Sequence, residues 1–159
     1  MDGGVDVMAV GDFEEVAALW REVGMWPHEG EDRQWWEAAL SRNPGCALVW
    51  REGGAVVGTV MGAWDGVRGW IYHLAVSPLR RGQGIGSKLL AAVEQRLQAA
   101  GVRQINLMVY EGELDSLVGF YSRRGYEPAP VRVMRKRLPA LANVRQEARC
   151  GGEKCTNQA

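Results

Sequence analysis

Alternating glycines, Gly82, Gly84 and Gly86, follow a pair of arginines in the segment SPLRRGQGIGSKLL, residues 77–90. A glycine-rich turn that leads into a helix exposes unpaired backbone N–H groups at the positive end of the helix dipole, and such a turn binds phosphate. The two arginines would add charge-assisted donors. A tight strand-to-helix connection with solvated arginines is the alternative that the glycines alone leave open. The segment predicts a loop that holds a diphosphate.

Two well-known phosphate loops can be compared with this spacing. A P-loop needs Lys and then Ser or Thr directly after its last glycine, but Ser87 separates Gly86 from Lys88 here. The dinucleotide fingerprint G-x-G-x-x-G opens a βαβ unit, whereas GQGIG is one residue short and follows strands predicted to form an antiparallel meander. Both motifs fail, although binding of an ordinary nucleotide remains an open alternative.

The six residues RGQGIG, 81–86, resemble the R/Q-x-x-G-x-G/A loop of the GNAT acetyltransferase superfamily. The surrounding segments agree, because IYHLAVSP precedes the loop, INLMV follows it, and GFYSRRGYEP is similar to the second cofactor-side motif of the family. With DFEEVAALW and VVGTVMGAWDG, the chain resembles the YpeA-type branch of small bacterial GNAT enzymes. The resemblance covers residues 5–138, so we expect a GNAT domain over residues 1–138.

This resemblance implies a mixed α/β (α+β) GNAT acyl-CoA N-acyltransferase fold, with a central, mostly antiparallel sheet of about six to seven strands and about four flanking helices. It implies acetyl-CoA as co-substrate, no metal, and transfer of the acetyl group to a primary amine by direct attack in a ternary complex. The amine could belong to a small molecule or to a protein. The residues expected to hold the cofactor are Leu74, Ala75, Val76, Arg81, Gly82, Gln83, Gly84, Ile85, Gly86 and Ser87.

Within this set, residues 74–76 would pair with the pantetheine arm and the thioester oxygen through backbone groups at a splayed strand edge. Tyr121 matches the tyrosine that commonly protonates the departing thiolate in the family. A free thiol titrates near ~8.5 and tyrosine near ~10, so the transfer is uphill by about 2 kcal/mol. Tyr121 is therefore the expected catalytic acid, with a core tyrosine as the alternative.

The base that must deprotonate the amine is not evident. The family places it on the strand before the loop, at positions that hold Trp70 and Tyr72 here, and neither is an obvious base. His73 titrates in the right range, but we expect it to be packed in the core. Without a base, the protein could instead be an acyl-CoA-binding module without turnover. Acidic residues in the loop after INLMV, which could act through a water or be solvated, are Glu111, Glu113 and Asp115.

Tryptophans gather in the N-terminal region that shapes the acceptor pocket in this family. We expect Trp20 to pack in the core, and adjacent Trp35 and Trp36 cannot both face inward fully, so one of them could line a groove or a dimer contact. Aromatic side chains there, Trp26 included, would suit an apolar or aromatic amine. A homodimer is thus an open alternative.

The elements that must position these residues follow from periodicity and turn signals. Asp12 and Glu15 suggest a capping box at the start of the first helix. The basic segment VRVMRKRL alternates as a sheet edge would. The first predicted helix begins at residue 12, and three further helices are predicted over residues 31–41, 85–100 and 114–124. Strands are predicted over residues 5–10, 46–52, 55–64, 70–76, 103–110 and 131–138.

Composition narrows the class of protein. The 159 residues suit a single domain, and 19 basic against 19 acidic residues give no reason to expect nucleic acid or a membrane as partner. No apolar stretch is long enough to span a bilayer and no secretory signal is evident, so we expect a cytoplasmic protein. Cys46, Cys150 and Cys155 form no disulfide framework or metal cage. Residues 139–159 are polar and aperiodic and are predicted to be a disordered tail.

Overall fold

The structure, a computed structural model, describes residues 3–25, 32–109, 114–136 and 138. Two compact units divide the chain, Met1–Val118 and Gly119–Ala159. The first unit carries the sheet and most of the helices, and the second begins within the last helix. The predicted tail, residues 139–159, lies outside the described residues.

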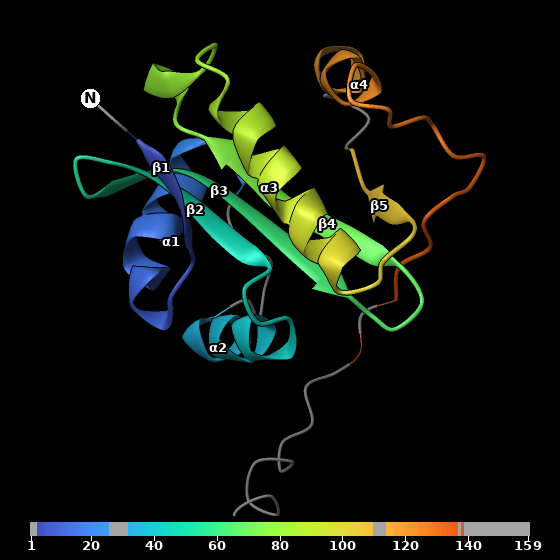
Figure 1. The fold of residues 1–159 in the computed structure, drawn as a ribbon, viewed down its shortest axis with the longest axis horizontal. Coiled ribbons are helices and arrows are strands. Elements are labelled where there is room, and N and C mark those ends of the chain that lie inside the picture. The colour runs from blue at the N-terminus through green and yellow to red at the C-terminus, as the bar shows by residue number, and fades with distance from the viewer. Residues whose placement is uncertain (1–2, 26–31, 110–113, 137, 139–159) are drawn as a thin grey trace, which may run out of the picture. The chain divides into compact units, whose positions relative to one another are not determined.

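A single sheet organises the first unit (Figure 1). The strands follow chain order, with antiparallel pairing from β1 to β4 and parallel pairing between β4 and β5. The mixed α/β class and the mostly antiparallel sheet are confirmed, with five strands in the described part where the sequence suggested about six to seven. The strands are β1 Gly4–Val7, β2 Ala47–Glu52, β3 Ala55–Trp64, β4 Gly69–Val76 and β5 Ile105–Leu107.

Helix α3, Ile85–Ala99, crosses one face of the sheet (Figure 1). Its apolar side is fully buried and comprises residues such as Leu89, Val93 and Leu97. The helix lies close to β3 because that strand presents glycine to it: a Cβ atom at Gly62 would stand 2.6 Å from a methyl carbon of Val93. At Gly58 of the same strand, a Cβ atom would stand 2.9 Å from a methyl carbon of Leu89 and 3.1 Å from one of Ile85, so the beginning of α3 also lies close to the sheet.

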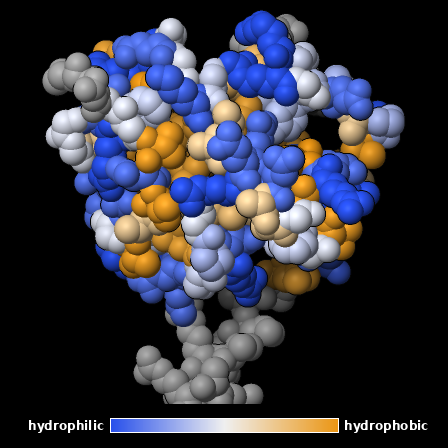
Figure 2. Space-filling view, in the orientation of Figure 1, coloured by the Kyte–Doolittle hydropathy of each residue, from blue (hydrophilic) through white to orange (hydrophobic). Residues whose placement is uncertain are grey.

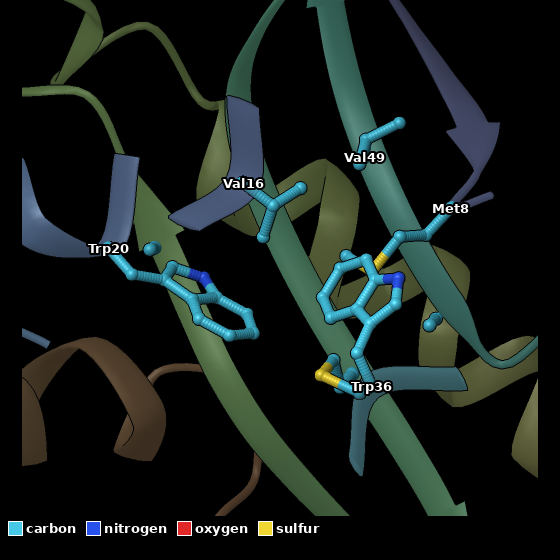
Figure 3. Close-up of a cluster of buried hydrophobic side chains, with 8 residues drawn as sticks. Met8, Val16, Trp20, Trp36 and Val49 are labelled. Atoms are coloured by element: carbon cyan, nitrogen blue, oxygen red, sulfur yellow. The ribbon is translucent and has the colours of Figure 1, made fainter. Parts of the chain in front are cut away.

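Helices α1, Phe13–Glu22, and α2, Arg33–Arg42, supply the core on the opposite face. Figure 3 shows Val16 and Trp20 of α1 beside Trp36 of α2. The ring centroids of Trp20 and Trp36 lie 5.7 Å apart in an edge-to-face arrangement, which suits the quadrupoles of two indoles. This contact joins the two helices on the face of the sheet opposite α3. The cluster consists of Met8, Val16, Trp20, Trp36, Ala47, Val49, Met61 and Ala75.

The expected capping box at the start of α1 is not formed. The Asp12 carboxylate accepts from the backbone N–H of Ala9 at 2.8 Å and pairs with Arg51 of β2, so it makes no cap bond to α1. The Glu15 carboxylate accepts from the N–H of Val56 at the start of β3. The preceding turn and the sheet therefore supply the partners of Asp12 and Glu15 in place of the helix-cap bonds that the sequence suggested.

Two predicted strands differ from the structure. The strand expected over residues 103–110 pairs only over Ile105–Leu107. No strand forms in the described part of residues 131–138, where the side chains of Val131 and Met134 are exposed. Alternation of apolar and basic residues made a strand plausible there, but a strand also needs a neighbouring strand to pair with.

Hydrophilic and hydrophobic residues are interspersed over the face shown in Figure 2. Among the helices of the described residues, none has both the length and the apolar composition that crossing a bilayer requires.

Candidate functional site

The glycine loop begins where β4 ends. The N–H of Ser77, the residue directly after β4, donates to the carbonyl oxygen of Val57 on β3 at 2.9 Å. Pro78 then starts a short 3-10 turn, Pro78–Arg80, in which the N–H of Arg80 donates to the carbonyl oxygen of Ser77 at 2.8 Å. Proline suits this first position because its nitrogen has no proton to satisfy. This turn connects the end of β4 to the loop that precedes α3.

Backbone geometry explains the glycines at positions 82 and 84. Both adopt left-handed conformations, with φ of +78° at Gly82 and +79° at Gly84, the residue that caps α3. A Cβ atom at either position would meet nothing within 4 Å, so both glycines border open space. Left-handed φ is unfavourable for residues with a Cβ atom, and the open space leaves room for a ligand against the main chain.

The amides of this loop are available to an anion. The first helical bond of α3 runs from the N–H of Lys88 to the carbonyl oxygen of Gly84 at 3.0 Å. Within the described ranges of the chain, no main-chain carbonyl accepts from the N–H groups of residues 82–86. Such donors at the positive end of a helix are suited to a diphosphate, and the assignment of these residues to a cofactor stays a prediction.

The two arginines of the loop have different partners. The Nε atom of Arg80 donates to the Glu52 carboxylate at the end of β2, at 2.6 Å. The exposed side chain of Arg81 instead reaches back, with its Nε atom 3.4 Å from the carbonyl oxygen of Val76. Glu52 was not identified from the sequence, because nothing local connects it to an arginine that follows β4, 28 positions later in the chain. Arg80 is therefore held by the protein, and Arg81 is the better candidate to contact phosphate.

A bulge interrupts β4 just before the residues expected to contact the pantetheine arm. Thr59 of β3 pairs with Ala75 and Met61 pairs with Tyr72, so β4 contains one more residue than β3 between these two pairs. The bulge includes His73, whose φ of +52° is left-handed and, for a residue other than glycine, costs about 1 kcal/mol or more.

This bulge reverses which backbone groups of β4 point away from β3. Before it, the N–H of Gly69 donates to the carbonyl oxygen of Gln104 on the β5 side at 2.9 Å. After it, the N–H of Ser77 points to β3, so alternation directs the groups of Ala75 to β3 and those of Leu74 and Val76 to the opposite side. The backbone groups of Leu74 and Val76 therefore point away from β3, whereas those of Ala75 point to β3, and contact with a pantetheine arm stays a prediction.

The side of β4 opposite β3 is unpaired beyond residue 71 within the described part of the chain. Pairing with β5 extends from Gly69 and Ile105 to Ile71 and Leu107 and includes no later residue of β4. Amides and carbonyls along the remainder of this edge could pair with an extended ligand as an added strand would. The edge ends at Val76, five residues before the loop begins at Arg81.

Aromatic residues of β4 face the side of the sheet covered by α1 and α2. Trp70 and Tyr72 stack with ring centroids 6.4 Å apart, and the Trp70 indole N–H donates to the Asp65 carboxylate at 3.0 Å. Burial raises the pKa of Tyr72, and the negative charge of Asp65 raises it further. A phenol that holds its proton this firmly is not a base at neutral pH, which agrees with the expectation from sequence.

The neighbouring histidine is a packing residue in this arrangement. The ring of His73 stacks on Trp20 at a centroid distance of 4.1 Å and meets the edge of Trp35 at 6.1 Å. Trp20 and Trp36 are fully buried, whereas Trp35 is half-buried and packs against the edge of the core, so the adjacent pair does not face inward fully at both positions, as expected. Trp26 lies outside the described residues.

Tyr121 belongs to the second unit. It lies in α4, Leu114–Ser122, and is half-buried between the rings of Phe120 and Tyr126, whose centroids are 5.1 and 5.6 Å from its own. Its role as catalytic acid stays a prediction. The three acidic candidates for the base, Glu111, Glu113 and the side chain of Asp115, lie outside the described part of the chain.

No group of three or more His, Cys, Asp or Glu side chains in the described ranges could hold a metal ion. Cys46 is buried and in no disulfide, and burial raises the pKa of its thiol despite the opposing charge of Arg96. Cys150 and Cys155 lie outside the described residues.

Known acetyltransferases are similar to this chain in sequence. An acetyltransferase of Yersinia enterocolitica, YE1169, is 36% identical over 134 residues, which span 84% of this chain and 94% of that protein. An uncharacterized N-acetyltransferase of Yersinia pestis is 36% identical over 127 residues, 80% of this chain and 89% of its own.

Solved structures share the fold at lower sequence identity. Ard1 from Thermoplasma volcanium superposes with a TM-score of 0.69 at 21% identity, over 79% of this chain and 82% of its own. A Trypanosoma brucei acetyltransferase gives 0.65 at 23% identity, over 86% of this chain and all of its own. Residues 13–126, which include both the glycine loop and Tyr121, match the Acetyltransferase (GNAT) family, and the chain therefore belongs to the GNAT family of acetyltransferases.

Proposed function

We propose that this acetyltransferase takes its acetyl group from acetyl-CoA and transfers it to a primary amine that attacks directly in a ternary complex. The observation that supports the donor is the set of loop amides, residues 82–86, without main-chain acceptors in the described part of the chain, at the N-terminus of α3. A diphosphate is the group of coenzyme A that such amides bind.

Individual residues then take distinct roles. Gly82 and Gly84 let the main chain approach the diphosphate, and Arg81 adds a charge beside it. Leu74 and Val76 offer backbone groups to the pantetheine amides along the unpaired edge of β4. The role of the remaining loop residues, Gln83, Ile85, Gly86 and Ser87, is to continue the phosphate-binding turn into α3.

Bound acetyl-CoA supplies an activated acyl group as a thioester. A backbone N–H on the unpaired edge would stabilise the negative charge that develops on the acyl oxygen, and Tyr121 would protonate the thiolate that leaves. The amine must lose its proton before it attacks, because an alkyl amine with a pKa near ~10.4 is almost entirely protonated at neutral pH. The acceptor, either a small molecule or a protein amine, remains to be identified by screening.

Calorimetry with acetyl-CoA, ATP and NAD tests the donor. We expect acetyl-CoA to bind at least about tenfold more tightly than either nucleotide, because only it can use both the loop and the edge of β4. Tighter binding of ATP or NAD would contradict the proposal. Release of free thiol from acetyl-CoA with a panel of amines, compared with the same panel without enzyme, then tests whether the acceptor is an amine.

A further inference from the structure

We propose that Thr59 is a positioning residue for the acyl donor, because its hydroxyl joins α1 to the bulge of β4 and fixes which backbone groups of that strand face the donor. The inference rests on the proposed use of the β4 edge by acetyl-CoA. It assigns a function to a threonine that otherwise stands out only as a polar residue within the apolar strand VVGTVMGAW.

Two hydrogen bonds of the Thr59 side chain carry the inference. The indole N–H of Trp20 donates to the Thr59 Oγ1 atom at 3.0 Å, and the Thr59 hydroxyl donates to the backbone carbonyl oxygen of His73 at 2.9 Å. Thr59 has no exposed surface, so both bonds form away from water. A hydroxyl that accepts one bond and donates another is oriented by its acceptor role, and its proton is thereby directed at the bulge.

The same bulge is held from a second direction. The ring of His73 stacks on the Trp20 indole that donates to Thr59, with centroids 4.1 Å apart and planes inclined by 21°. Trp20 is itself wedged beside Val16 and Trp36 in the core (Figure 3). A left-handed residue in a strand is unfavourable unless its surroundings impose it, and here a hydrogen bond to its carbonyl and a stacked ring on its side chain both do so.

The position of the bulge matters because strand alternation has a period of two. Without the extra residue, the pairing of β4 with β3 after residue 72 would shift by one, and Ala75 would present its backbone away from β3 in place of Leu74 and Val76. The Ala75 side chain would then leave the core cluster in which it is buried. Thr59 thus connects the N-terminal core to the orientation of the edge expected to bind the pantetheine arm.

Three variants test this role. Thr59→Val has nearly the same shape and removes both hydrogen bonds, whereas Thr59→Ser keeps the hydroxyl. Val60→Ala is the matched control, because Val60 is equally buried on the same strand and, by alternation, faces α3. Thermal unfolding measures the stability of each variant, and calorimetry measures the dissociation constant for acetyl-CoA.

We expect Thr59→Val to weaken binding of acetyl-CoA at least about tenfold, because misplaced contact groups lose affinity steeply. Thr59→Ser should bind within about threefold of the unchanged protein. Val60→Ala should lower the unfolding temperature without a comparable loss of binding. This difference would show that the weaker binding of Thr59→Val does not result from a general loss of stability. Unchanged binding by Thr59→Val, or an equal loss in Val60→Ala, would overturn the inference.

Failure of the proposed function is distinguishable from failure of this inference. If the unchanged protein does not bind acetyl-CoA, the donor assignment is wrong, and amide hydrogen exchange at Ala75 and Ser77, whose N–H groups point to β3 after the bulge, then tests the bulge directly. Faster exchange at these amides in Thr59→Val than in Val60→Ala would support the role of Thr59 in holding the bulge. Equal exchange in the two variants would refute it.

Discussion

The Nε atom of Arg81 lies 3.4 Å from the carbonyl oxygen of Val76, so the first side chain of the glycine loop is folded back against the last residue of β4. This contact places a positive charge between the two segments expected to bind acetyl-CoA. It also uses the Val76 carbonyl on the side of β4 away from β3, as the alternation after the bulge requires.

Replacing Arg81 with alanine should raise the dissociation constant for acetyl-CoA about tenfold, since a charge-assisted contact to phosphate is lost. The dissociation constant of this variant should also depend less on ionic strength than that of the unchanged protein. Calorimetry at two salt concentrations measures both effects. The matched control is Arg80→Ala: Arg80 is paired with Glu52, so its loss should lower the unfolding temperature while binding changes less than about threefold. Equal losses of binding in the two variants would contradict the assignment.

Gly84 and Gly101 form a pair at the two ends of α3 with nearly the same backbone conformation, φ of +79° and +92°. A Cβ atom at either glycine would meet nothing within 4 Å, so alanine causes no clash. The left-handed backbone alone should make alanine destabilise the fold by about 1 kcal/mol at each position. Only Gly84→Ala should weaken binding of acetyl-CoA, by about tenfold, because only there would the methyl group stand in the ligand's approach. Urea unfolding and calorimetry of both variants separate the two effects. Normal binding by Gly84→Ala would show that the loop does not contact the donor closely.

Local signals determined what could be predicted from the sequence. The strand 55–64 was predicted residue for residue, because turn residues bound it on both sides and β-branched residues are frequent within it. The glycine loop was identified for the same reason, since left-handed positions and the start of the helix after them are encoded within a few residues.

Features that depend on distant partners were not predicted. The bulge at His73 arises from the register of β4 against β3, so the sequence could only group Leu74, Ala75 and Val76 as one set and could not distinguish the directions of their backbone groups. Asp12 was assigned to a helix cap but pairs with Arg51, which is 39 positions later in the chain. Periodicity reports which face a side chain takes, and it does not report which polar partner it finds there.

Trp36 should contribute to stability through its shape more than through its polar group. It has no exposed surface, and within the described part of the chain its indole N–H has no hydrogen-bond partner. Trp36→Ala should lower the free energy of unfolding by about 3–5 kcal/mol, because a large cavity opens beside Phe13 and Trp20. Trp36→Phe should lower it by about 1.5 kcal/mol or less, since no hydrogen bond is lost. Urea unfolding with unchanged m-values measures both, and equal losses would mean that the N–H has a partner after all.

Tyr72 should not be the base that activates the amine. Burial and then the charge of Asp65 raise the pKa of its phenol above the ordinary value near ~10, so the group is protonated throughout neutral pH. Tyr72→Phe should therefore leave the acidic limb of the pH profile of kcat/KM in place between about pH 6 and 9, with rates within about threefold. The profile is measured with any amine found to release free thiol. Disappearance of that limb in Tyr72→Phe would assign the base to Tyr72.

Tyr121 and Tyr126 are a matched pair of phenols in contact, with ring centroids 5.6 Å apart in the second unit. Tyr121→Phe should lower kcat about a hundredfold, the usual effect of losing a positioned proton donor, and should leave the dissociation constant for acetyl-CoA nearly unchanged. Tyr126→Phe removes the same hydroxyl from the neighbouring ring and should leave kcat within about twofold, because only one phenol can serve the departing thiolate. Steady-state kinetics and calorimetry of both variants measure this split. An unaltered kcat in Tyr121→Phe would exclude the residue as the acid, and a large loss in Tyr126→Phe would transfer the role to the neighbouring tyrosine.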